Sequence, residues 1–116
     1  MNKNTCIFCE TLSDGSRIIF NTTHFFVIRD GFPVSEGHTL IIPKKHRADI
    51  FSLRANEWSD LPTAIRRVKA RLDRELKPDG YNIGINCGEA AGQTIFHLHI
   101  HIIPRYTGVK KPRAVR

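Results

Sequence analysis

Histidine and apolar side chains alternate without a break over residues 96–102. In a β-strand, residues two apart lie on one face, so this alternation predicts a strand with two chemically different faces. The residues expected to face a core are Phe96, Leu98, Ile100 and Ile102, and those expected on the opposite face are His97, His99 and His101. Half of the six histidines of the chain fall within five residues. This concentration indicates a functional site on a buried strand rather than scattered surface positions.

The remaining sequence predicts an α+β fold with about five strands in an antiparallel sheet. Strand-like segments occupy 17–20, 24–29, 38–43, 81–86 and 95–104, and the first two read as a hairpin. The segment 81–86 alternates apolar and polar residues, which is typical of a half-buried strand. One amphipathic helix is expected over 56–76. Its apolar stripe consists of Trp58, Leu61, Ile65, Val68 and Leu72.

Pro62 conflicts with this helix, because proline lacks the amide hydrogen and its ring clashes with the preceding turn. Two arrangements would accommodate it. Either the helix kinks at Pro62, or Asp60 caps a new helix that has Pro62 in its first turn.

The length, net charge and cysteine count of the chain indicate how many domains it has, which partners it favours and where it is located. With 116 residues we expect one domain over 1–116, with a core of about 6–106 and a basic tail over 107–116. The net charge of +7 favours anionic partners. The apolar stretches are far shorter than the roughly 20 residues of a membrane span, and three cysteines do not form a complete set of disulfides. We therefore expect a soluble cytoplasmic protein without a membrane partner.

The three clustered histidines allow two kinds of site. On a straight strand the outer two residues lie about 13 Å apart, so one ion with bonds of about 2.0 Å hardly reaches all three rings. Two neighbouring rings could still share an ion. The alternative is a row of imidazoles along a phosphate chain. With a usual pKa near 6.5, imidazole is a neutral nucleophile at pH 7 and, after a small shift, a proton donor.

The sequence resembles the histidine triad (HIT) superfamily of nucleotide hydrolases and transferases, in its zinc-carrying bacterial-type branch. The resemblance rests on the His-x-His-x-His motif and on three further segments in order: 37–46 (GHTLIIPKKH), 92–94 (GQT) and 103–106 (IPRY). It covers nearly the whole chain, from Cys6 to Tyr106. It implies a HIT-like fold with one long helix, a short N-terminal helix and pairing into a homodimer.

The resemblance also implies roles for individual residues. His99 matches the nucleophile that attacks the α-phosphorus, His101 a partner that faces the phosphate, and His38 a histidine that supports the nucleophile. The implied nucleotide-binding residues are Gln93 and Thr94 as phosphate or leaving-group donors, Asn86 near the phosphate, Asp30 on the ribose hydroxyls, and Ile7, Phe8 and Ile28 as apolar walls. Asp30 is equally readable as a turn residue, and Phe8 and Ile28 as core residues. We see no carboxylate cluster for magnesium, so the chemistry need not require a catalytic metal.

A second motif, Cys6-x-x-Cys9, is weak by itself, because such a pair can be redox-active, incidental or half of a zinc site. Zinc needs two more ligands. The resemblance implies that His46 and His97 supply them, in a closed structural site that fastens the N-terminus to the sheet. The alternative is two buried thiols with His46 on the surface.

The function expected first is a metal-independent nucleotidyl hydrolase or transferase acting on a purine nucleotide. It would attack the α-phosphate of a nucleoside phosphoramidate, a dinucleoside polyphosphate or an adenylate through a covalent nucleotidyl-histidine. A second hypothesis is a nucleotide-binding regulatory module with little turnover. We do not expect a nucleic-acid partner, because many of the cations lie on the polar side of the helix and in the tail, without interleaved aromatic residues.

Overall fold

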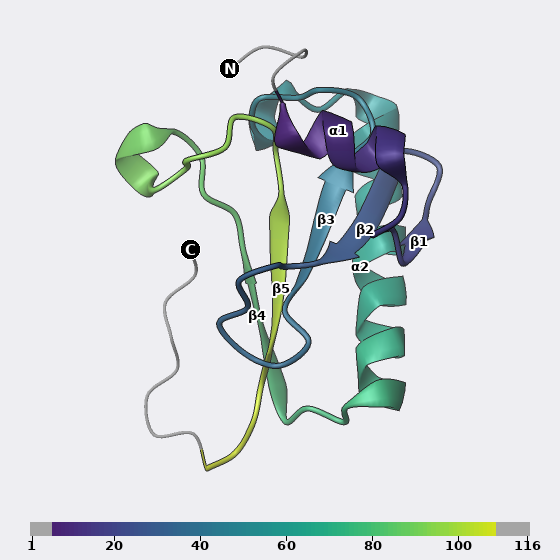
Figure 1. Ribbon diagram of the computed structural model, residues 1–116, viewed down its shortest axis with the longest axis vertical. Helices are drawn as coiled ribbons and strands as arrows, with labels where there is room; N and C mark the ends of the chain where they lie inside the picture. Colours follow the sequence, from purple (N-terminus) through teal and green to yellow (C-terminus); the bar gives the residue numbers. More distant parts are fainter. Residues whose placement is uncertain (1–5, 109–116) are drawn as a thin grey trace.

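A five-stranded antiparallel sheet forms the centre of the fold (Figure 1). The computed structural model describes residues 6–108; residues 1–5 and positions 109–116 of the expected basic tail lie outside the described part. The strands are β1 (Phe20–Asn21), β2 (Phe25–Arg29), β3 (Thr39–Pro43), β4 (Gly80–Gly84) and β5 (Ile100–Arg105), in the spatial order β1-β2-β3-β5-β4. The helices are α1 (Ile7–Asp14) and α2 (Ala55–Glu75), with short 3-10 helices η2 (Ile50–Ser52) and η3 (Glu89–Ala91). The predicted α+β class, with one long helix and one short N-terminal helix, is confirmed.

The two faces of the sheet bury different sets of side chains. Val27 lies opposite Ile41 in the pairing of β2 with β3, and both contribute to a core beneath α2. The alternate residues Ile28 and Leu40 are also opposite one another, but they pack with Phe8 of α1 in a second cluster. The sheet therefore lies between α2 on one face and α1 on the other.

Helix α2 buries Leu61, Ala64, Val68 and Leu72, which confirms most of the predicted stripe. Trp58 is an exception, with 44% of its surface exposed, whereas the preceding Glu57 is 2% exposed. Glu57 faces inward because its carboxylate accepts the backbone N–H of Arg54 at the start of the helix, at 2.6 Å. Neither α1 nor α2 has the combination of length and apolar character that crossing a membrane requires.

Pro62 lies inside α2, which continues through it from Ala55 to Glu75. Of the two arrangements considered for Pro62, a new helix start capped by Asp60 is therefore wrong. The carboxylate of Asp60 instead accepts the hydroxyl of Thr22 and the backbone N–H of His24, both at 2.7 Å. Asp60 thus ties the middle of the helix to the turn between β1 and β2.

Strand β5 begins at Ile100, five residues after the start of the predicted segment 95–104. The backbone N–H of Leu98 donates to the carbonyl of Arg47, at 2.7 Å, rather than to a neighbouring strand. Leu98, Ile100 and Ile102 still face the α2 core as predicted, but Phe96 is only partly buried and is not part of it.

The two edge strands also differ from expectation. β1 is reduced to two residues, and the hairpin that it forms with β2 is confirmed. In β4, Tyr81 is partly buried against the α2 core, as the alternation predicted, but Ile83 is 56% exposed, so the strand is half-buried only at its start. The exposure of Ile83 follows from the position of β4 at the edge of the sheet, beyond β5.

Candidate functional site

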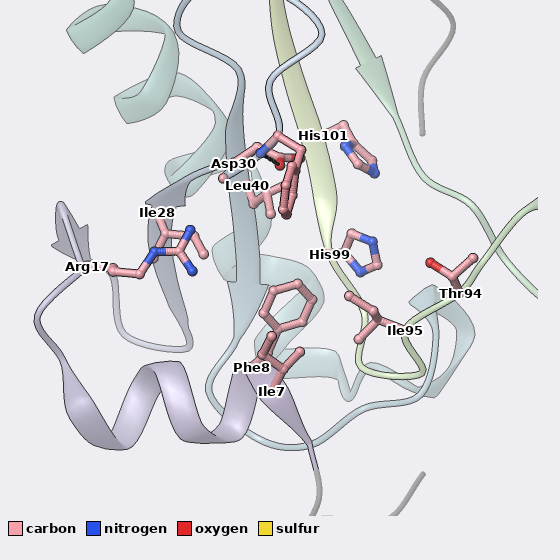
Figure 2. A pocket seen from close by; sticks show the side chains of 12 residues that line it. Ile7, Phe8, Arg17, Ile28, Asp30, Leu40, Thr94, Ile95, His99 and His101 are labelled. Carbon is pink, nitrogen blue, oxygen red and sulfur yellow. Dashed lines mark hydrogen bonds between the residues drawn. The ribbon is translucent and has the colours of Figure 1, made fainter.

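A cavity of about 290 Å³ opens on the α1 face of the sheet (Figure 2). His101 faces it because this residue pairs with Leu40 of β3, which lies on the same face. The lining residues are Ile7, Phe8, Arg17, Ile28, Asp30, Gly31, Phe32, Leu40, Thr94, Ile95, His99 and His101. Seven of the ten residues predicted for catalysis or nucleotide binding are therefore brought together. The other three, His38, Asn86 and Gln93, do not line this cavity.

The ring of His99 has a fixed tautomer. Its Nδ1 lies 2.9 Å from the carbonyl oxygen of His97, so Nδ1 carries the hydrogen and donates it. Nε2 then keeps its lone pair. Burial lowers the pKa of His99 below its usual value, which keeps the ring neutral at pH 7. The result is an imidazole whose nucleophilic nitrogen remains available in the cavity.

His38 and His101 form a hydrogen-bonded pair behind the cavity. The backbone N–H of Val34 donates to Nδ1 of His38 at 3.1 Å, so Nε2 of His38 carries the hydrogen. This Nε2 lies 2.9 Å from Nδ1 of His101 and 3.4 Å from a carboxylate oxygen of Asp30. Nδ1 of His101 is therefore an acceptor, and its Nε2 is the N–H donor. A carboxylate and a second imidazole thus orient His101.

The backbone just before His38 passes close to the end of α2, which requires glycine at position 37. The φ of Gly37, +88°, is in the region that favours glycine, and a Cβ here would lie 2.6 Å from a side-chain carbon of Leu76. The short sequence Gly37-His38 therefore brings the backbone against α2 while the imidazole of His38 stays on the α1 face.

Gln93 does not serve as the predicted phosphate donor in this structure. Its side-chain amide donates to the carbonyls of Ala48 and Ile95 at 2.7 and 3.0 Å, and its oxygen accepts the N–H of Gly88 at 2.8 Å. Both amide hydrogens are thus engaged by backbone, so Gln93 supports the loop that presents Thr94. Asn86 is half-buried beside Gly92 of the same loop.

A second cluster brings together the four residues predicted to bind metal. The potential ligand atoms of Cys6, Cys9, His46 and His97 all lie within 4.8 Å of one another. Nδ1 of His97 is 3.2 Å from the sulfur of Cys6 and 3.6 Å from that of Cys9, and Nδ1 of His46 is 3.3 Å from the sulfur of Cys9. Ligands of a tetrahedral zinc, with bonds of about 2.0 to 2.3 Å, lie about 3.3 to 3.8 Å apart. The spacing fits such an ion.

The ring of His97 is also oriented as a ligand would be. Its Nε2 donates to the carbonyl of Pro43 at 2.9 Å, so Nδ1 presents its lone pair to the cysteines. The triad is thereby divided: His97 belongs to the cysteine cluster, whereas His99 and His101 belong to the cavity.

Comparison with known proteins agrees with this arrangement. Residues 13–108 match the sequence profile of the HIT domain family. The chain belongs to the HIT family. The uncharacterized HIT-like protein MG132 of Mycoplasma genitalium is 40% identical over 111 residues, which cover 91% of this chain and 79% of that protein.

Two further HIT relatives are relevant to the cysteine–histidine cluster and to the cavity. A crystal structure of a zinc-bound histidine triad family protein from Mycobacterium smegmatis superposes with a TM-score of 0.82 at 35% identity, over 94% of this chain and 81% of that one. The adenylylsulfatase HINT3 of Arabidopsis thaliana is 33% identical over 105 residues, which are 89% of this chain but 53% of that protein.

Five cavity residues of this HIT domain were not predicted from the sequence: Leu40, Ile95, Arg17, Gly31 and Phe32. Leu40 could have been found, because it lies two residues after His38 and so on the same face of a strand. Ile95 adjoins Thr94 in the chain. Arg17, Gly31 and Phe32 reach the cavity only through tertiary structure.

Proposed function

We propose that this HIT protein is a nucleotidyl hydrolase or transferase that forms a covalent intermediate on His99. The observation that carries the proposal is the fixed tautomer of His99, with Nδ1–H on the carbonyl of His97 and a free lone pair on Nε2 beside the cavity. A neutral imidazole suits attack on a phosphate, because it acquires positive rather than negative charge as the bond forms.

The reaction would proceed in two displacements. Nε2 of His99 attacks the α-phosphorus, and the bond from phosphorus to the leaving group breaks. The charge gained by the ring is shared with the carbonyl of His97 through Nδ1–H. Water then attacks the phosphorus, the phosphorus–nitrogen bond breaks, and His99 returns to its neutral form as the nucleoside monophosphate leaves.

Preorganised donors would supply most of the rate enhancement. His101, held through Nδ1 by His38, directs its Nε2–H toward the negative charge that develops on phosphate or leaving group. Asp30, 3.4 Å from Nε2 of His38, helps to orient the N–H of that nitrogen. Thr94, on the exposed rim next to His99, provides a hydroxyl.

The rest of the cavity suits a purine nucleoside. Ile7, Phe8 and Ile28 provide apolar walls for a flat base, and Asp30 lines the same cavity and would accept hydrogen bonds from the ribose hydroxyls. The substrates that we propose are nucleoside phosphoramidates, dinucleoside polyphosphates or adenylates. The name of HINT3 as an adenylylsulfatase supports the last class.

We also propose that Cys6, Cys9, His46 and His97 hold a structural zinc ion. Zinc would supply a crosslink between the start of α1, the end of β3 and the triad segment, because these ligands meet only in the folded chain. The M. smegmatis structure supports this assignment. Cysteines available as ligands suit a reducing compartment, and we propose the cytoplasm.

The proposed oligomer is a homodimer. β4 forms an open edge of the sheet and exposes Ile83 and Ile85, and an uncovered apolar edge strand favours pairing with another chain. A second copy would cover both residues and remove the open edge. We do not propose a nucleic-acid or membrane partner.

Turnover of adenosine 5′-phosphoramidate tests the proposed function. We expect His99→Ala to reduce turnover to the uncatalysed background, and His101→Ala or His38→Ala to reduce it on the order of 10²-fold. His24→Ala is the matched control, because this histidine lies at the start of β2 outside the cavity. Turnover by His99→Ala at the wild-type rate would refute the assignment. Tight nucleotide binding without turnover by the wild type would support a regulatory module instead.

A further inference from the structure

The polar side chains of the cavity are unevenly distributed. Thr94 and His99 lie at one end, and Arg17 lies beside Ile28 at the other (Figure 2). Of the side chains labelled in Figure 2, only that of Ile28 lies beside Arg17, whereas the ring of Phe8 packs against His99 with the ring centroids 5.1 Å apart. If phosphate binds at His99, the base extends toward Arg17, which among the described lining residues supplies the side-chain hydrogen-bond donors at that end.

The guanidinium of Arg17 is held by a backbone hydrogen bond but has no carboxylate partner among the described residues. Its Nη2 donates to the carbonyl of Arg29 at 2.9 Å, and the same nitrogen lies 3.7 Å from the position of a Cβ on Gly31. Within residues 6–108, no carboxylate lies within ion-pair distance of Arg17. A guanidinium has five N–H donors, so donors remain on Arg17 for a ligand.

We propose that Arg17 reads the edge of the base and makes the enzyme prefer guanine to adenine. This inference rests on the proposed function, because it places a nucleotide in the cavity with its phosphate at His99. Guanine presents two adjacent acceptors, O6 and N7, which match the paired donors of a guanidinium. Adenine presents N7 beside an amino group, so one donor of Arg17 would face another donor. Hypoxanthine has the same O6 and N7 edge as guanine.

Binding of GMP, IMP and AMP by calorimetry tests this preference directly. We expect GMP and IMP to bind alike, and both about tenfold more tightly than AMP. That factor is near the low end for a bidentate contact, because Arg17 is exposed to water. Arg17→Met keeps the aliphatic stem but removes the donors, and it should bring the three dissociation constants together. Arg17→Lys should lose most of the preference, because lysine retains the charge without the paired donors.

Arg66→Met is the matched control, because Arg66 is an exposed arginine of α2 outside the cavity. It should leave the order of affinities unchanged. Equal affinities for the three nucleotides in the wild type, or a preference that survives Arg17→Met, would overturn the proposal. IMP behaving like AMP would assign the preference to the 2-amino group of guanine and would overturn it as well.

Turnover of guanosine and adenosine 5′-phosphoramidates with the same amine separates this proposal from the proposed function. A His99-dependent rate with no preference between the two bases would remove only the role of Arg17. A GMP preference that depends on Arg17, without turnover of either substrate, would remove the enzymatic function and keep base recognition. Failure of all three nucleotides to bind would overturn both.

Discussion

The stability of the fold should depend strongly on Glu57, a buried carboxylate outside the cavity. It accepts the N–H of Arg54 at 2.6 Å and the Nε of Arg47 at 3.0 and 3.2 Å. The carbonyl of Arg47 in turn accepts the N–H of Leu98, between His97 and His99. Glu57 thus connects the start of α2 to the triad segment.

The cost of Glu57→Ala follows from these contacts. Loss of the helix-capping contact costs about 1 kcal/mol. Breaking a fully buried ion pair costs about 3 to 5 kcal/mol, but the side chain of Arg47 is 22% exposed and regains water. We therefore assign about 1 to 2 kcal/mol to the lost pair, for a sum of about 2 to 3 kcal/mol. With an unfolding entropy of about 0.24 kcal/mol/K for a chain of this length, the melting temperature should fall by about 8 to 12 °C.

Thermal unfolding followed by circular dichroism measures this change. The control is Glu75→Ala, because Glu75 also contacts two arginines, Arg29 and Arg71, at 3.0 and 2.8 Å, but on the surface of α2. Exposed pairs of this kind contribute about 0.3 to 0.5 kcal/mol each, so loss of both pairs should cost no more than about 1 kcal/mol and about 4 °C. Equal losses in the two variants would refute the reasoning that burial makes Glu57 important.

Three further outcomes follow from the structure. Purified protein should carry about one zinc per chain. Chelation should lower the melting temperature while the folded fraction keeps activity, and so should the double variant Cys6→Ser and Cys9→Ser. Metal-free protein of unchanged stability would contradict the zinc site. Burial lowers the pKa of His99, and the neutral ring is the nucleophile, so kcat/KM should be at its maximum above this pKa and fall as the pH drops through it. The midpoint of this fall should lie below the usual imidazole pKa of about 6.5. A midpoint above that value would count against a neutral nucleophile. Light scattering at micromolar concentration should give the mass of a dimer, and Ile83→Asp should shift it toward the monomer; a monomeric wild type would refute the dimer.

Much of the fold follows from patterns within single segments. The alternation over residues 96–102 correctly assigns Leu98, Ile100 and Ile102 to the α2 core, because a strand places every second residue on one face. The hairpin and the long helix follow from turn residues and helical periodicity in the same way.

The failures have a common cause in long-range contacts. Nothing near Leu98 in the sequence indicates that Arg47 takes its N–H, and this bond delays the start of β5. The alternation of β4 gives no sign that the strand is at an edge, so the exposure of Ile83 was not predictable. Likewise, Gln93 finds its partner Ala48 at a distance of 45 residues in the chain, which no local motif specifies.

The candidate site and its division between the cavity and the cysteine cluster were predictable from the resemblance but not from local patterns. The resemblance supplied the residues that meet in the cavity and in the cysteine cluster. What separates His97 from His99 is the backbone carbonyl that each ring contacts, Pro43 for one and His97 itself for the other. Such contacts depend on the bends over residues 95–97, which the alternating pattern hides.

The central claim is that His99 becomes covalently attached to the nucleotide during turnover. Wild-type protein mixed with adenosine 5′-phosphoramidate, quenched within a turnover under non-acidic denaturing conditions and analysed by intact mass and peptide mapping, tests it most directly. The account predicts one added nucleoside monophosphate group on the peptide that contains His99, which disappears as substrate is consumed and is absent in His99→Ala. An adduct on a different residue, or product formation in single-turnover experiments with no adduct at any quench time, would contradict it.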